Sequence, residues 1–197
     1  NLRGFLHAGV IAAGPWLLAC VALALMQSMV RDVANPAALL RFNSAAVLAF
    51  SISLVVAGPW VLVVSRCLAD AIHAKRVDGV ASMMFKSLAW VWVLLALIGV
   101  PLLGGVLALP VPDRVLGFVL LMVAGGLWVV AAMMSALRSY TTVSGAFALG
   151  LLVGSTVAYF TLRPLQGTGL LLGLVVGLVL VFFILAARLL AEFPAGA

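Results

Sequence analysis

Ala13-Gly14-Pro15-Trp16-Leu17-Leu18 recurs in the next apolar run of the chain as Ala57-Gly58-Pro59-Trp60-Val61-Leu62. Proline removes a backbone donor and clashes with the preceding turn, while the glycine beside it permits a bend. In a bilayer, neighbouring helices can re-satisfy the freed carbonyl group, so such a break is tolerated inside a membrane helix. The repeat predicts two kinked helices, with bends at Gly14, Pro15, Gly58 and Pro59. The kinks either shape static packing or act as hinges, and their duplication favours hinges.

Composition places the chain in the membrane class. Of its 197 residues, 66% are hydrophobic and 8% are charged, whereas soluble domains average about 45–50% apolar and about 25% charged residues. The two cysteines, Cys20 and Cys67, have no spacing typical of a metal site or a disulfide framework. The sequence therefore predicts an all-α integral membrane protein.

The apolar runs predict a single domain over residues 1–197, a bundle of six transmembrane helices, because each span needs about 20 apolar residues. The predicted spans lie near residues 6–29, 42–65, 85–109, 115–137, 141–160 and 167–190. Proline-containing stretches predict turns at Pro110-Val111-Pro112-Asp113 and at Arg163-Pro164. The chain begins with Asn1 and has no signal-peptide pattern, so we expect further sequence upstream.

Basic residues set the expected orientation. Lys and Arg concentrate in the connection at 66–84 and at Lys86 just beyond it, and the positive-inside rule places such loops in the cytoplasm. Both ends of the chain are then cytoplasmic. The charges of this connection either form a solvated helix end that fixes topology or form a docking surface for a cytoplasmic partner; they are Arg66, Asp70, Lys75 and Arg76.

Small residues form stripes on the last two predicted spans. Gly150 and Gly154 are four residues apart, and Gly169, Gly173 and Gly177 repeat the spacing on the next span. Small residues let helix backbones approach closely, which drives association in lipid. We expect these spans to form a tight hairpin.

Polar side chains within the spans are candidates to line a transport pathway. They are Asn43, Ser135, Arg138 and Tyr140. Arg138 either faces such a pathway or anchors a helix end. No acidic residue is predicted deep in a span, and no clustered metal ligands or phosphate-binding loop occur. We expect no cofactor, no metal and no catalytic residue.

The order of several short motifs resembles the PelG family of exopolysaccharide exporters. The motifs are Ala8-Gly9-Val10-Ile11, Gly14-Pro15-Trp16, Gly58-Pro59, Ser65-Arg66, Ala69-Asp70, Leu137-Arg138-Ser139-Tyr140 and Glu192-Phe193-Pro194. Ser65 stands where the family usually has threonine.

The resemblance implies a multidrug/oligosaccharidyl-lipid/polysaccharide flippase, built as two six-helix lobes around a cleft, of which this chain would be the first. It further implies a transporter rather than an enzyme, one that exports an amino-sugar polymer across the inner membrane of biofilm-forming Gram-negative bacteria. Implied partners are a second lobe, a cytoplasmic glycosyltransferase and other Pel inner-membrane proteins, with no nucleic acid.

Two other classes remain open from the sequence. A non-transporting scaffold subunit of a polysaccharide-synthesis complex would have the same composition. A multi-span transferase acting on lipid-linked sugar would need an Asp-rich cytoplasmic loop, which this chain lacks.

Overall fold

The computed structural model describes residues 20–21, 24, 26–28, 35–74, 79–106, 109–137 and 139–193. Within these ranges the elements are α2 (Pro36–His73), α3 (Val80–Pro101), a π-helical segment (Leu102–Val106), α4 (Val111–Ala136), α5 (Tyr140–Leu165) and α6 (Gly167–Glu192). Five helical stretches are long and apolar enough to cross a membrane. The predicted all-helical membrane class is confirmed, while most of the first predicted span, residues 6–29, lies outside the described residues.

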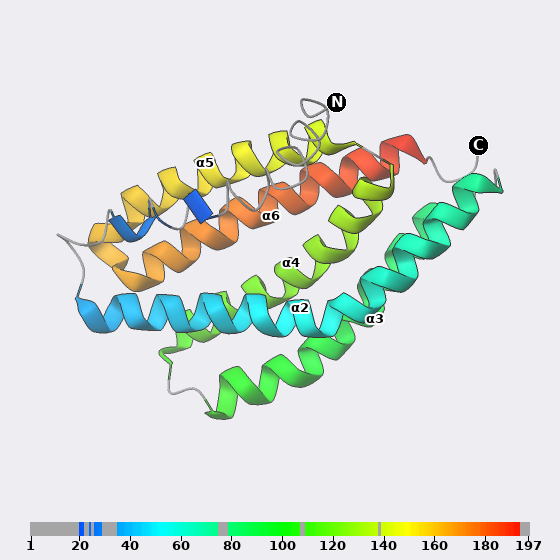
Figure 1. Cartoon of the computed structure of the whole chain (residues 1–197). Helices are drawn as coiled ribbons and strands as arrows, with labels where there is room; N and C mark the ends of the chain where they lie inside the picture. The colour runs from blue at the N-terminus through cyan, green and yellow to red at the C-terminus, as the bar shows by residue number, and fades with distance from the viewer. Residues whose placement is uncertain are drawn as a thin grey trace, which may run out of the picture.

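The helix α2 is longer than the predicted span 42–65. Its 38 residues begin at Pro36, after the side chain of Asn35 accepts a hydrogen bond from the Ala37 amide at 3.0 Å. At 1.5 Å per residue this helix is about 57 Å long, well beyond a hydrocarbon core of about 30 Å. Much of the connection at 66–84 is therefore helical, since α2 runs on to His73 and α3 starts at Val80. Figure 1 shows α2 changing direction in its cyan stretch. Pro59 lies inside this helix.

The predicted turn at Arg163-Pro164 is wrong, because both residues lie in the last turn of α5. Pro164 lacks the donor of one backbone hydrogen bond, yet the helix continues past it to Leu165. The reversal occurs instead at Gln166, which has a φ of 49°. The next residue must be small, since a Cβ on Gly167 would clash with the backbone of Ala38 in α2.

Two further boundaries differ from the sequence prediction. The third span was predicted to run to residue 109, but its α-helix ends at Pro101 and continues as the π-helical segment. Proline lacks an amide donor, and the glycines at 104 and 105 add freedom, so regular α-helix stops there. In contrast, α4 begins before the predicted residue 115, because Pro112 and Asp113 suit a first helical turn.

The helices α4 and α6 form the centre of the described bundle. In each of these two helices, half of an apolar stretch of 18 residues is buried, whereas the buried share of the corresponding stretch is 22% in α2 and 28% in α3. The helix α4 packs against α2, α3 and α6, whereas α5 packs chiefly along α6 (Figure 1). Leu62 of α2 and Leu97 of α3 lie on exposed apolar faces, as expected of helices in contact with lipid.

The antiparallel helices α5 and α6 approach at their glycines. A Cβ on Gly154 would lie 2.6 Å from the carbonyl oxygen of Gly173, and one on Gly177 would lie 2.6 Å from that of Gly150. Near the turn, the Thr161 hydroxyl donates to the Gly169 carbonyl oxygen at 3.1 Å. Side chains at these glycines would force the two backbones apart.

Candidate functional site

A buried acid joins three helices at one end of the bundle. Asp113 lies in the first turn of α4 and is 3% exposed. The Thr168 hydroxyl, in the first turn of α6, donates to its Oδ1 at 2.5 Å. Arg41, in the second turn of α2, places Nε 3.5 Å from its Oδ2. The starts of α2, α4 and α6 are thus held together by one carboxylate.

The electrostatics of this cluster suit a charged carboxylate. The amide groups at the start of α4 favour an anion there, and Arg41 supplies a positive charge. The Arg41 Nε has no hydrogen-bond partner of good geometry among the described residues, so its contact with Asp113 is an ion pair only. The Arg41 side chain is 42% exposed, so solvent screens the pair.

Sequence reasoning missed this cluster because it assigned Asp113 to a turn. The signal available was an acid just after two prolines at a helix start, and a threonine at the start of another helix. Neither signal indicates which helices are neighbours.

Among the candidate pathway residues, Asn43 lies at the same end as Asp113. Its side chain accepts a hydrogen bond from Gln27 Nε2 at 3.3 Å. The two amides line an open cavity of about 260 Å³ together with Phe42, Phe50 and Ser51. This cavity offers amide and hydroxyl groups beside aromatic rings.

The structure places Ser135 and Tyr140 at the opposite end. Since α2 and α4 start together at Asp113, Ser135 lies 22 residues further along α4, or about 33 Å. Its hydroxyl donates to the Ala131 carbonyl at 2.8 Å, while Tyr140 is 38% exposed. Arg138 lies outside the described residues. The three described candidates therefore do not form one site, since Asn43 lies toward one end of the bundle and Ser135 and Tyr140 lie toward the other.

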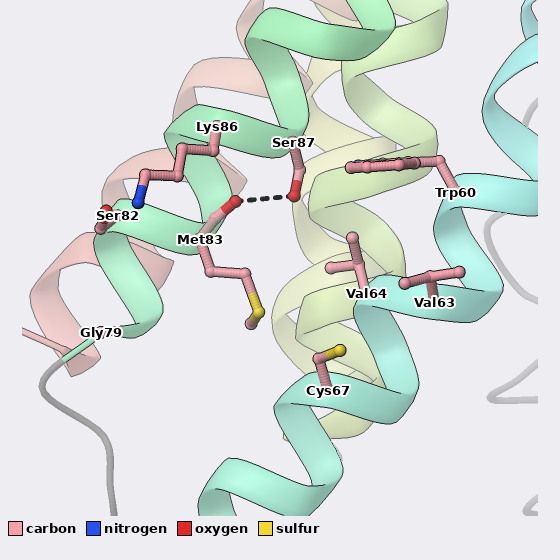
Figure 2. A pocket seen from close by; sticks show the side chains of 9 residues that line it. All are labelled: Trp60, Val63, Val64, Cys67, Gly79, Ser82, Met83, Lys86 and Ser87. Carbon is pink, nitrogen blue, oxygen red and sulfur yellow. Dashed lines mark hydrogen bonds between the residues drawn. The ribbon is translucent and has the colours of Figure 1, made fainter.

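A second open cavity, of about 380 Å³, follows the break in α2. It lies between α2 and α3 and is lined by Trp60, Cys67 and Met83 among others (Figure 2). In this view the indole of Trp60 extends toward Ser87. The Ser87 hydroxyl donates a hydrogen bond to the Met83 carbonyl oxygen at 2.6 Å. Trp60 Nε1 is buried and has no hydrogen-bond partner among the described residues.

Of the four charged residues predicted to face a cytoplasmic partner, the structure describes Arg66 and Asp70. Arg66 Nε lies 3.5 Å from Asp70 Oδ2 on the continuing α2, with side chains 82% and 67% exposed. Such an exposed pair contributes at most about 0.5 kcal/mol. Lys75 and Arg76, like the first break at Gly14 and Pro15, lie outside the described residues.

No group of three or more His, Cys, Asp or Glu side chains that could hold a metal ion occurs in the described part of the chain. The site residues there are hydroxyls, amides, aromatic rings and isolated ion pairs. Such groups bind polar ligands by hydrogen bonds and stacking.

Long apolar helices, packed through glycines and joined by short turns, define this molecule as a multi-pass membrane protein. The family is also settled. The model of the PelG family, described as "Putative exopolysaccharide Exporter (EPS-E)", matches residues 1–197, and the chain belongs to that family. Neither the curated proteins nor the solved structures contain a match to this chain.

Proposed function

We propose that this chain is a six-helix lobe of an exporter that carries an exopolysaccharide from the cytoplasm to the periplasm across a bacterial inner membrane. The observation that carries the proposal is the family match over the whole chain. The five membrane-length helices support it, and residues 6–29 would supply the sixth. A second six-helix lobe of the same protein would complete a flippase-like cleft.

The substrate in this proposal is a Pel-like amino-sugar polymer made by a cytoplasmic glycosyltransferase, which would contact the exporter together with other Pel inner-membrane proteins. Sugars are held by hydrogen bonds and by aromatic rings rather than by apolar walls. The amides of Gln27 and Asn43 and the ring of Phe50 are groups of this kind.

The mechanism would use the helix breaks as hinges between states open to either side. Pro59 interrupts the hydrogen bonding of α2 just before the cavity at Trp60. The Arg41–Asp113–Thr168 cluster joins the other end of α2 to α4 and α6. Movement at Pro59 would therefore swing one half of α2 while the other half stays fixed.

Inside-out membrane vesicles test the function directly. In such vesicles, polymer moved toward the periplasmic face collects in the lumen. We expect vesicles that contain the whole protein and the synthesis machinery to make polymer that resists an added glycoside hydrolase until detergent is supplied. Vesicles without the protein should leave the polymer digestible.

The same assay separates the alternatives. A scaffold would raise the amount of polymer without protecting it from the hydrolase. A transferase would be required for synthesis itself, so no polymer would form in its absence. Either result would contradict the proposed export function.

A further inference from the structure

The cavity of about 380 Å³ that follows the break in α2 has apolar walls and a polar rim. Side chains of α2 and α3 extend into the gap between the two helices and form the walls, among them Trp60, Val64 and Met83 (Figure 2). The rim is the start of α3, where Ser82 and Lys86 line the cavity. None of the nine lining residues is acidic. The cavity therefore joins apolar surface to groups that suit an anion.

The polar groups of the rim are donors without partners in the described part of the chain. Lys86 is exposed and forms no ion pair with a described residue. Ser82 lies one turn before it on the same face of α3, and its hydroxyl makes no hydrogen bond to any of those residues. Gly79 precedes the helix and has no side chain to cap the amide groups of the first turn. An ammonium, a hydroxyl and helix-start amides together are typical of phosphate binding.

The cavity opens beside the lipid-facing surface of the bundle. Val63, which lines it, is exposed, and so are Leu62 on α2 and Phe85 and Trp90 on α3. Large apolar side chains exposed on membrane-length helices contact lipid. Just beyond the cavity, α2 continues into a charged stretch that begins at Arg66. The rim therefore lies where an apolar membrane face meets a charged helix end, which is the level of lipid headgroups.

We propose that this cavity binds one anionic phospholipid, with its phosphate at Ser82 and Lys86 and an acyl chain against Trp60, Val64 and Met83. Basic pockets between membrane helices bind anionic headgroups in this way. Charge complementarity selects the headgroup, because the rim offers a cation and no acid. The apolar walls favour a lipid over free phosphate, since phosphate alone would leave them in contact with water. The proposal does not depend on the export function.

A bound lipid would support the end of α2 that packs least on the bundle. Of the nine buried residues of α2, seven precede Pro59 and only Val64 and Leu68 follow it. An acyl chain in the cavity would bury apolar surface of this end and join it to α3. A ligand that binds only the folded state stabilises it. Anionic lipid should therefore raise the unfolding temperature of the protein.

Lipid binding by the whole exporter tests the site. The purified protein in neutral detergent is mixed with dioleoyl phosphatidylglycerol, dioleoyl phosphatidylcholine or glycerol 3-phosphate, and native mass spectrometry measures the bound fraction. Phosphatidylglycerol should bind about fivefold or more tightly than phosphatidylcholine, which is the effect of one basic residue near a membrane surface. Glycerol 3-phosphate should not displace it. Equal binding of the two lipids, or displacement by glycerol 3-phosphate, would overturn the proposal.

A matched pair of charge variants separates the site from general attraction to a basic helix end. Lys86→Gln should weaken phosphatidylglycerol binding about fivefold and leave phosphatidylcholine binding unchanged. Arg66→Gln removes an equal charge from an exposed side chain of α2 that does not line the cavity. It should weaken binding by less than about twofold, because solvent screens exposed charges at a distance. Equal losses in the two variants would refute a specific site.

Filling the cavity tests the apolar part of the site. Cys67 lines the cavity from α2 and is exposed, so Cys67→Trp would occupy the space of the acyl chain without entering the core of the bundle. This variant should lose phosphatidylglycerol binding together with the rise in unfolding temperature that the lipid gives to the wild-type protein. Wild-type binding by Cys67→Trp would place the lipid elsewhere and refute the proposal. A wild-type protein that binds no lipid would do the same, and would indicate that a protein segment covers the cavity.

Discussion

The Thr168 hydroxyl donates a 2.5 Å hydrogen bond to Oδ1 of Asp113, so the first turn of α6 is tied to the first turn of α4. These residues are separated by all of α4 and α5 in the chain. Their contact, with Arg41 on the other carboxylate oxygen, sets where three helices begin relative to one another.

Loss of this hydrogen bond should destabilise the fold. Thr168→Val keeps the shape of the side chain but leaves a buried carboxylate oxygen without its donor, which costs about 1–3 kcal/mol. The control Thr156→Val removes a hydroxyl that bonds only within its own exposed helix and should change stability by less than about 0.5 kcal/mol. The measurement is the thermal unfolding midpoint of the protein in detergent; equal midpoints for the two variants would contradict the structural role of Asp113.

Alanine at two glycines of α5 should have opposite effects. The Cβ of Gly154→Ala would lie 2.6 Å from the Gly173 carbonyl oxygen, so α5 and α6 must separate, at a cost of about 1–3 kcal/mol. At Gly145 a Cβ meets nothing within 4 Å, and alanine favours helix by up to about 1 kcal/mol. Unfolding of both variants in denaturing detergent, followed by circular dichroism, checks the signs; a stable Gly154→Ala protein would show that the helices do not need this contact.

The helix breaks should matter more for export than for folding. Replacing Pro15 and Pro59 with alanine restores two backbone donors, so the double variant should insert normally yet export less polymer. The assay compares external polymer at equal membrane abundance. Wild-type export by the double variant would mean that the breaks only shape static packing.

Charge reversal in the connection tests partner binding. Lys75→Glu with Arg76→Glu should weaken co-purification of the cytoplasmic glycosyltransferase while the amount of exporter stays unchanged. These residues also favour a cytoplasmic loop, so accessibility of a cysteine at Ala74 is measured alongside. Unchanged co-purification with a correctly placed loop would refute the docking role, whereas an outward loop would assign the charges to topology.

Two substitutions at Arg138 distinguish a residue that contacts sugar from one that anchors a helix end. Lysine keeps the charge but lacks the planar set of donors of arginine. If Arg138 contacts sugar, Arg138→Lys should export as poorly as Arg138→Ala at equal abundance. Full export by the lysine variant would identify Arg138 as an anchor.

The sequence by itself determined the membrane class and the main helices. Uninterrupted apolar runs of about 20 residues have no other stable arrangement in lipid, because every backbone group must bond within its own helix. Local signals also predicted that few residues separate the end of α4 from the start of α5, and that α6 begins at Gly167. They failed at Arg163-Pro164, where the fold continues the helix to Leu165 and reverses at Gln166.

Only the tertiary structure decided which residues meet. The burial of Asp113 depends on α2 and α6 lying beside the start of α4, and nothing in the sequence around residue 113 specifies those neighbours. The same arrangement places Asn43 far from Ser135 and Tyr140. Hydrogen-bonding needs within one helix are local and readable in sequence, whereas contacts between helices depend on how side chains from distant segments fit together.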